Sequence, residues 1–383
     1  MKIKTLKFTD KSTQWKLSKT VFDDLTLLVG ASGVGKTQIL MSILKIRSIA
    51  KGKSRNGASW DIEFSISPKS KYRWTGEFNI VDESKFSLNR DDSNSNKPVL
   101  LSEKITLNKK VIASRTSKRI TFNGKKTPLL SSNDSLVYLF KEEKIIAPIF
   151  QEFQDILYSD QSDSKERPNR FNGDLMEIAS KLSKYKSLED IRNSNLNIET
   201  KLFLALHNCK KMAKTIKDRY INIFPFVEDI KYSPLDHKLT PSIMKDIPFI
   251  QIKEKGVEDW IISSSISSGM YRTLMHLSEL YLCPENSVIL IDEFENSLGI
   301  NCIDELTMDL LTSNDRNIQF ILTSHHPYII NKINFNNWQI VTRKGSVVTT
   351  RNANKVLNFS GSRQKAFTIL TQSEEFNTGQ TEV

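Results

Sequence analysis

The first strong pattern of apolar positions lies near the start of the chain. Residues 25–29 form a short and nearly continuous apolar run, as expected for a strand that is buried on both faces. The run ends in a glycine-rich turn, after which apolar residues recur at the spacing of one helix face, namely Ile39, Leu40, Ile43 and Leu44. The pattern predicts a buried strand, a tight turn and a helix, in that order.

The hydrophobic pattern changes between residues 60 and 122, where apolar and polar residues alternate in stretches separated by turns. Four stretches show the alternation, namely 61–66, 71–80, 104–107 and 119–122. A period of two is typical of strands that bury one face. The sequence therefore predicts an antiparallel, β-rich insertion.

Helical periodicity dominates from residue 174 to about 224. Apolar residues follow two helical stripes, the first made of Leu175, Ile178 and Leu182, and the second of Leu202, Leu206, Cys209, Met212 and Ile216. These stripes predict a helical subdomain.

Two later apolar runs, 287–291 and 317–323, flank a further helical pattern made of Ile303, Leu306 and Leu310. The order of strand, helix and strand predicts a second unit with parallel strands. The tail after about Ser360 is polar and is expected to be loose.

Composition narrows the class of protein. An apolar content of 38% over 383 residues supports a packed core. The three cysteines, Cys209, Cys283 and Cys302, are too few and too scattered for a disulfide framework or a paired-cysteine zinc site. No apolar run approaches the ~18 residues of a membrane-spanning helix, and residues 1–15 lack an apolar stretch for export. The expected location is the cytoplasm, with no membrane partner.

Charge is unevenly distributed along the chain. Residues 1–126 hold 26 Lys and Arg against 11 Asp and Glu, whereas the rest holds 29 against 33. The excess suggests a polyanion or an acidic partner, although a lysine-rich soluble surface has the same composition. Eight basic residues crowd the insertion: Lys104, Lys109, Lys110, Arg115, Lys118, Arg119, Lys125 and Lys126. On strands they would form either a stripe that pairs with phosphates or a charged edge that prevents sheet pairing.

The turn after the first strand carries the clearest chemical signal. Gly30-Ala31-Ser32-Gly33-Val34-Gly35-Lys36-Thr37 fits the phosphate-binding pattern G-x-x-x-x-G-K-[ST], between a strand and a helix as that pattern requires. Glycines allow successive amides to converge on phosphate oxygens at a helix N-terminus. We expect Lys36 to bridge the β- and γ-phosphates of ATP and the Thr37 hydroxyl to bind Mg²⁺.

A second run supplies the matching carboxylates. Four apolar residues, 288–291, end in Asp292 and Glu293, and parallel sheets present their ligands at the carboxyl ends of strands. Asp292 would hold Mg²⁺, and Glu293 would polarise the attacking water. The alternative is a strand end with two solvated carboxylates.

Ile266-Ser267-Ser268-Gly269-Met270 opens a helical pattern before these carboxylates and resembles the signature motif of ABC-type ATPases, usually Leu-Ser-Gly-Gly-Gln. The motif is degenerate here, with Ser268 in place of the first glycine and Met270 in place of glutamine. The resemblance implies that Ser267 and Gly269 contact the γ-phosphate bound to another protomer. Without it, Ser267 is most simply a helix cap.

Two more short motifs resemble those of the SMC/RecF/OLD-like branch of these ATPases. They are Phe294-Glu295-Asn296-Ser297-Leu298 and Thr323-Ser324-His325-His326-Pro327. The resemblance implies that Ser297 belongs to the D-loop, which lies between the two protomers, and that His325 senses the γ-phosphate; a structural histidine is the alternative. The branch often continues Leu-His-Pro after the D-loop serine, whereas this chain has Leu298-Gly299-Ile300. Gln151 stands where the family places its Q-loop glutamine, although Gln154 is close and a surface glutamine is the plainer interpretation.

The resemblance implies an α/β fold: a P-loop, ABC-type ATPase head with a mostly parallel core sheet, an antiparallel β insertion and a helical subdomain. Residues 1–58 would form the N-terminal half of the ATPase core, 59–158 the insertion with the Q-loop region, and 159–250 the helical subdomain. Residues 251–358 would form the C-terminal half of the core, with the signature, carboxylates, D-loop and switch histidine, and 359–383 a polar tail.

The family also implies an ATP-hydrolysing switch in which two protomers close head to tail, as a homodimer or a higher oligomer. The motifs that contain Ser297 and His325 look most like those of ATPase subunits of bacterial anti-phage defence systems, PtuA-like or PARIS-type. Such subunits control a separate nuclease or toxin. We expect no nuclease within the chain, because only 56 residues follow Pro327 and the five histidines lack metal-ligand spacing. The alternatives are a RecF/SMC-like repair ATPase that binds DNA and, third, a transporter component.

Overall fold

The computed structural model describes residues 1–81, 97–159, 175–234, 248–296 and 316–357, with single positions between 302 and 307 and between 368 and 379. The chain divides into two compact units. Unit 1 comprises residues 1–158, 286–294 and 317–383, and unit 2 comprises 159–285 and 295–316. Unit 1 therefore joins the N-terminal residues to segments almost 300 positions later. In the described part of the chain, no helix is long and apolar enough to cross a membrane.

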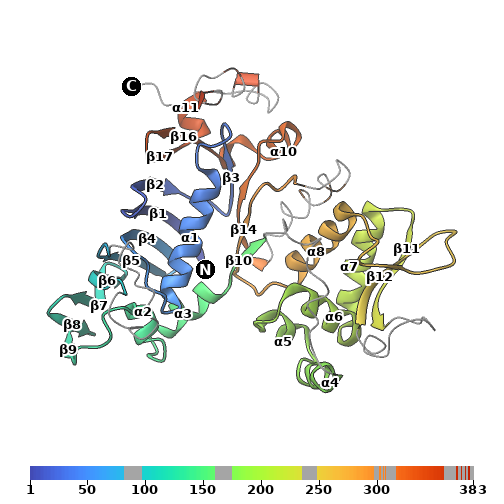
Figure 1. The fold of residues 1–383 in the computed structure, drawn as a ribbon, viewed down its shortest axis with the longest axis horizontal. Coiled ribbons are helices and arrows are strands. Elements are labelled where there is room, and N and C mark those ends of the chain that lie inside the picture. The colour runs from blue at the N-terminus through green and yellow to red at the C-terminus, as the bar shows by residue number, and fades with distance from the viewer. Residues whose placement is uncertain are drawn as a thin grey trace, which may run out of the picture. The chain divides into compact units, whose positions relative to one another are not determined.

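Unit 1 is built on one mixed sheet, which contains fourteen strands in the part of the chain that the structure describes (Figure 1). In spatial order they are β10 (Ile156–Ser159), β14 (Val288–Ile291), β15 (Gln319–Thr323), β3 (Leu25–Val29), β16 (Trp338–Lys344), β17 (Val347–Asn352), β2 (Trp15–Val21), β1 (Lys2–Asp10), β4 (Ala58–Ser67), β5 (Ser70–Phe78), β6 (Leu100–Leu107), β7 (Lys110–Thr116), β8 (Arg119–Phe122) and β9 (Lys125–Thr127).

The middle of this sheet is parallel. β14 pairs with β15, β15 with β3 and β3 with β16, all in parallel. Every residue of β14 and β15 is buried, as are four of the five in β3. The continuous apolar runs therefore form strands covered on both faces, as the sequence predicts.

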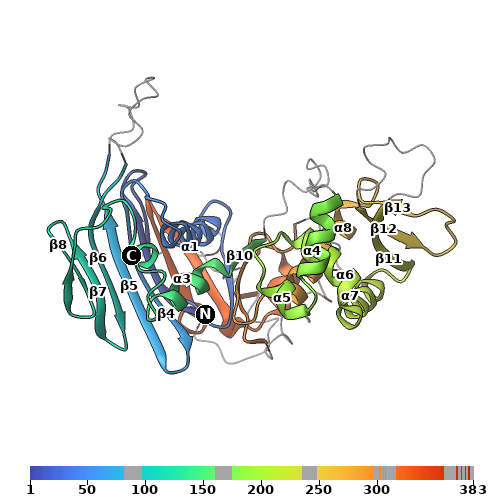
Figure 2. The same cartoon turned by 90° about the horizontal axis from the view of Figure 1, so that it is seen from below.

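From β2 onward the sheet is antiparallel, and the strands of the β insertion continue it rather than forming a separate layer. One face carries packed aromatic rings, among them Trp60, Trp74 and Phe78, and the helical residue Phe153 packs edge-on against Trp74. Helices α1 (Lys36–Ala50), α2 (Leu136–Leu139) and α3 (Ala147–Gln154) lie on one side of the sheet (Figure 2). The opposite face is polar and open, because alternate residues point to opposite sides of a strand.

Glu103 lies within the buried face of the insertion. Its carboxylate accepts hydrogen bonds from Trp74 Nε1 and from the Leu136 amide, both at 2.8 Å. Burial of the charge raises the pKa of Glu103 to about 7, against the smaller opposing effects of these donors and of nearby Arg115. The insertion therefore contains an acid that is half-neutralised at physiological pH.

The segment that closes unit 1 contains α10 (Pro327–Lys332), the 3₁₀ turn η4 (Phe335–Asn337) and α11 (Ala353–Leu357). The polar tail that follows was expected to be loose, and this expectation is wrong at the described positions. Thr368, Ile369, Gln372, Phe376 and Thr378 are helical. The Gly379 carbonyl accepts a hydrogen bond from the Arg343 amide at 2.7 Å.

Unit 2 is mainly helical, with α4 (Leu175–Lys184), α5 (Leu188–Asn193), α6 (Ile198–Asn208), α7 (Lys210–Ile223) and α8 (Ser268–Leu282). A small antiparallel sheet, which the sequence does not predict, adds β11 (Val227–Pro234), β12 (Pro248–Glu254) and β13 (Ile261–Ile262). Helix α8, which follows the residues that resemble the signature motif, groups with this unit. Ile303, Leu306 and Leu310, which predict a helix after β14, lie outside the described residues.

The predicted fold class is confirmed: the protein has an α/β fold with a parallel core, an antiparallel β insertion and a helical subdomain. The four alternating stretches of the insertion all form strands. The glycine-rich turn joins β3 to α1 in unit 1.

Candidate phosphate-binding site

The glycine-rich turn adopts a backbone that other residues would not tolerate. Gly30 has φ 153°, and a Cβ there would lie 2.5 Å from the Val341 carbonyl oxygen. Gly35 has φ 103° and forms the left-handed N-cap of α1, where a Cβ would lie 2.9 Å from Val348 Cγ2. Both positions combine a positive φ with close packing against β16 or β17, so glycine is required.

Lys36 is the first residue of α1, and its side chain folds back over the turn. It is only 9% exposed, and its Nζ donates to the carbonyl oxygens of Gly30 at 2.8 Å and Ala31 at 2.9 Å. Gly35 supplies no side-chain cap to the helix amides, and Thr37 is exposed beside them. The loop therefore brings a positively charged group and helix-terminal amides together. This arrangement favours the binding of an anion.

The carboxylates after β14 are held by the neighbouring strand. Thr323, the last residue of β15, donates its hydroxyl to Asp292 Oδ1 at 2.5 Å. The same hydroxyl oxygen accepts the Glu293 amide at 2.7 Å, and the Thr323 carbonyl accepts the Phe294 amide at 3.1 Å. Asp292 is half-buried, whereas Glu293 is exposed and has φ 46°, an uncommon conformation for a residue other than glycine. One buried threonine therefore holds the Asp292 carboxylate and the backbone of Glu293.

Strand register brings the turn and the carboxylates to one edge of the sheet. Ile291 of β14 is opposite Leu322 of β15, and Leu322 is opposite Leu27 of β3. All three strands are parallel, so their carboxyl ends point the same way. With strands about 4.8 Å apart, the ends of β3 and β14 are separated by about 10 Å.

The two histidines after β15 differ in their environments. His326 caps α10: its Nδ1 accepts the Tyr328 amide at 3.3 Å, and its own amide donates to the Ser324 hydroxyl at 3.1 Å. His325 is exposed two residues beyond Thr323, at the edge where the carboxylates lie. His326 therefore has a structural, helix-capping role, and the γ-phosphate role of His325 stays a prediction.

Four other predicted residues lie elsewhere in the fold or outside the described residues. Gln151 is exposed on α3, in agreement with the alternative of a surface glutamine. Ser267 is the N-cap of α8 in unit 2, and its hydroxyl accepts the Met270 amide at 3.3 Å. Gly269 lies in the first turn of the same helix, and Ser297 is outside the described residues. The cap interpretation of Ser267 is confirmed; the roles implied by the resemblance stay predictions.

Several neighbours of the turn were not predicted from the sequence. Trp15 Nε1 is buried, has no hydrogen-bond partner among the described residues, and lies 3.8 Å from the Cβ position of Gly35. Arg343 donates to the Gly33 carbonyl at 3.5 Å, and Gly379 lies against Val34. These contacts come from strands and tail residues far away in sequence, so no local pattern signals them.

The donors at this edge fit a hard divalent cation. The Asp292 carboxylate and the Thr37 hydroxyl are oxygen ligands of the kind that Mg²⁺ prefers, and Mg²⁺ typically binds one or two protein ligands together with substrate phosphates. Among the described residues, no group of three or more His, Cys, Asp or Glu side chains is arranged to hold a metal ion by itself. A metal at this edge would therefore be completed by a bound nucleotide.

The parallel core and the loop between β3 and α1 define a P-loop nucleotide-binding domain of the AAA type. Residues 25–331 match the family model described as "AAA domain, putative AbiEii toxin, Type IV TA system", and the chain belongs to this family. A comparison of the sequence with curated proteins gives no match.

Among solved structures, the chain is similar to an SMC head bound to the C-terminal winged-helix domain of ScpA, at 14% identity and a TM-score of 0.45, over 92% of this chain and 98% of that one. It is also similar to the SMC head domain from Thermotoga maritima, at 13% identity and a TM-score of 0.42, over 92% and 99%. An Smc head with an extended coiled coil, bound to the C-terminal domain of ScpA from Pyrococcus furiosus, aligns at 13% identity and a TM-score of 0.45, over 97% and 99%.

Proposed function

We propose that this protein binds and hydrolyses ATP at the carboxyl edge of β3, β15 and β14, and that it acts as the switch component of a bacterial defence complex. The observation that carries the proposal is the parallel register that places the loop around Lys36 and the carboxylates of Asp292 and Glu293 at one edge. The estimated separation of about 10 Å between strand ends is one that a triphosphate with its metal ion covers.

Each residue has a distinct task in this proposal. The amides at the start of α1 and Lys36 hold the phosphates, and Thr37 and Asp292 hold Mg²⁺ against them. Bound Mg²⁺ would neutralise the charge that develops on the phosphates. Glu293 accepts a proton from the attacking water, and His325 hydrogen-bonds the γ-phosphate. The Thr323 hydroxyl fixes the position of both acids.

We further propose that a second protomer completes the site. Ser267 is exposed at the N-terminus of α8, a 15-residue helix whose first amides suit a phosphate. Together with Gly269 and the D-loop residue Ser297, it would contact the γ-phosphate of the partner protomer. ATP would then hold two protomers together, and hydrolysis would release them.

The defence role is supported by the family rather than by the site. The family description names a putative toxin of a type IV toxin–antitoxin system, which is a system of more than one component. A separate effector, a nuclease or a toxin, would respond to the closed and open states of the ATPase. The alternative, a RecF/SMC-like ATPase that binds DNA, is favoured by the basic surface described below.

Glu293→Gln directly tests the assignment of Glu293 as the base that accepts the proton of the attacking water. The amide keeps the shape of the side chain but cannot accept the proton, so turnover should fall about 10²-fold or more while ATP still binds. Light scattering coupled to gel filtration with Mg²⁺ and ATP should then show a persistent dimer. Glu285→Gln, an exposed glutamate just before β14, is the matched control and should behave like the parent. Parental turnover by Glu293→Gln would show that another residue is the base.

A further inference from the structure

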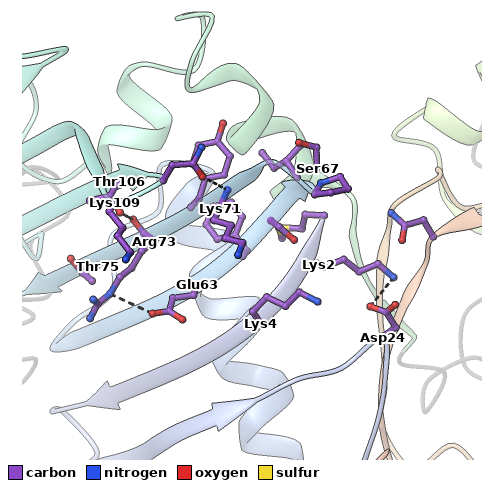
Figure 3. A pocket seen from close by; sticks show the side chains of 18 of the residues that line it. Lys2, Lys4, Asp24, Glu63, Ser67, Lys71, Arg73, Thr75, Thr106 and Lys109 are labelled. Carbon is purple, nitrogen blue, oxygen red and sulfur yellow. Dashed lines mark hydrogen bonds and ion pairs between the residues drawn. The ribbon is translucent and has the colours of Figure 1, made fainter.

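Unit 1 contains a cavity of about 1220 Å³ on the open face of the sheet, lined mainly by β1, β4, β5 and β6. It is larger than the roughly 300–1,000 Å³ typical of small-molecule sites. Six basic residues line it, against the two acids Asp24 and Glu63. The basic residues are Lys2, Lys4, Lys71, Arg73, Lys104 and Lys109. Figure 3 shows the labelled members of this group on neighbouring strands around the cavity.

Strand register places these charges on one surface. Lys2 is opposite Ser65, which is opposite Lys71, so one row crosses β1, β4 and β5. A second row runs from Glu63 through Arg73 to Thr106, and a third joins Thr75 to Lys104. The alternate residues Phe64, Tyr72 and Trp74 are buried on the helix-covered face. The basic residues are therefore forced onto the open face by the same alternation that forms the core.

Only part of this charge is neutralised within the protein. Arg73 makes a two-pronged contact with Asp61 at 2.8 and 2.7 Å, and Lys2 lies 3.2 Å from Asp24. The described residues offer no ion pair to the exposed Lys4, Lys71, Lys104 or Lys109. Four ammonium groups on one surface repel one another, and a bound polyanion would remove that repulsion.

The lining favours contacts with phosphates over stacking on bases. Ser65, Thr75 and Thr106 lie between the basic residues, and hydroxyl groups commonly donate to phosphate oxygens. The two aromatic residues at the cavity, Phe64 and Tyr72, stack on each other in the core, 5.4 Å between ring centroids, and are at most 7% exposed. They are not available to stack on splayed bases, which is how single strands are usually held.

We propose that this surface, formed by Lys2, Lys4, Lys71, Arg73, Lys104 and Lys109, binds the phosphate backbone of a nucleic-acid duplex without sequence specificity. The cations are spread over β1, β5 and β6 and the turn after β6 instead of converging on one point, which suits an extended polyanion better than a single phosphate. None of these residues belongs to the ATP site, so the proposal stands or fails independently of ATP hydrolysis.

The structure also corrects the basic stripe expected from the sequence. Of the eight basic residues in the insertion, Lys104 and Lys109 line the cavity. Arg115 is buried instead, 4% exposed, and donates to the Asp134 carbonyl at 2.9 Å beside Glu103. It therefore cannot contribute to a phosphate stripe.

The test is binding of a labelled 30-base-pair DNA duplex of mixed sequence, followed by fluorescence anisotropy between 50 and 200 mM salt. The parent should bind with a log–log salt slope of about −4, because each neutralised phosphate contributes about −0.9. Lys71→Ala combined with Lys104→Ala should reduce the slope by about two and weaken binding about 10-fold or more at low salt. The Arg substitutions at both positions should restore binding.

The matched control is Lys53→Ala combined with Lys144→Ala, two exposed lysines beside the helices that cover the other face. It removes the same charge and should keep parental affinity and slope. Three outcomes would overturn the proposal. The first is an equal loss of DNA affinity in this control, and the second is DNA binding that does not change with salt. The third is preferential binding of the same residues to anionic vesicles or an acidic peptide. ATP turnover should stay parental in the Lys71/Lys104 variant, and Lys36→Ala should keep DNA binding, so failure of one site is distinguished from failure of the other.

Discussion

The two candidate surfaces of unit 1 belong to the same sheet but are constructed differently. The proposed ATP site depends on eight consecutive residues around Lys36 and on the ends of three adjacent parallel strands. The basic surface draws its residues from β1, β5, β6 and the turn after β6, and antiparallel register places them side by side. A contiguous motif can be recognised in a sequence, whereas a surface built by register requires the fold.

Loss of the Lys36 side chain should give the largest effect. Its ammonium group is held over the turn at the start of α1, and loss of one such charged donor costs roughly 10²–10³-fold in rate. Lys36→Ala should abolish detectable ATP turnover and weaken ATP binding in calorimetry, while Lys53→Ala should change neither. Near-parental turnover by Lys36→Ala would mean that the phosphates bind elsewhere.

Glu103 gives a pH test of the insertion that carries the basic surface. Its pKa is raised from 4.5 to about 7 by burial, so the folded state holds a proton that the unfolded state releases. Glu103 contributes at most about 3 kcal/mol to the free energy of unfolding. This contribution is fully present below about pH 4.5 and is lost as the pH rises through 7. Urea unfolding should therefore have a lower midpoint at pH 8 than at pH 5.

Glu103→Gln removes the titrating group and should flatten this dependence. The amide is neutral at every pH, although it cannot accept both hydrogen bonds, so the variant should be less stable than the parent at pH 5. An unchanged difference between pH 5 and pH 8 in the variant would assign the effect to other groups.

Gly30→Ala tests the geometry of the turn. The added Cβ would meet the Val341 carbonyl at 2.5 Å in a backbone conformation that alanine rarely adopts, a strain of about 1–3 kcal/mol. Thermal unfolding should show a lower midpoint, and ATP affinity should fall with it. Gly124→Ala is the control, because its φ of 78° is also positive but no atom lies within 4 Å of the Cβ position. Equal losses of stability and ATP affinity in both variants would show that the close approach to β16 is not the cause.

Arg343→Ala should give the smallest effect. The guanidinium donates to the Gly345 carbonyl at 2.7 Å and to the Gly33 carbonyl at 3.5 Å, and the side chain is exposed. Exposed contacts of this kind contribute about 0.2–1 kcal/mol. ATP affinity measured by calorimetry should fall only a few-fold, with DNA binding unchanged. A loss as large as that of Lys36→Ala would give Arg343 a direct role at the phosphates.

The sequence was sufficient where the relevant contacts are local or periodic. The turn at residues 30–37 fixes its own backbone through glycine, and the run 288–291 is apolar enough to predict a buried strand that ends at Asp292. These two patterns predicted both halves of the ATP site and the α/β fold. The alternation in the insertion likewise predicted its strands.

The sequence was insufficient where a residue's role depends on a distant partner. Thr323 of β15 bonds the Asp292 carboxylate and the Glu293 amide, and Val348 of β17 packs on Gly35, yet neither contact has a local signature. Arg115 looks like its exposed neighbours but is buried by the strand pairing that places it opposite Glu103. The continuity of the insertion with the core sheet follows from pairing of β1 with β4, which sequence periodicity cannot express.

The most direct test of the central claim is a structure of the protein with Mg²⁺ and a nonhydrolysable ATP analogue. The account predicts the β- and γ-phosphates against the amides of residues 33–37 and Lys36 Nζ, with the metal bound by the Thr37 hydroxyl and held from the far side by Asp292. A nucleotide bound at another place, or a metal ion with Asp292 outside its coordination sphere and hydration shell, would contradict it.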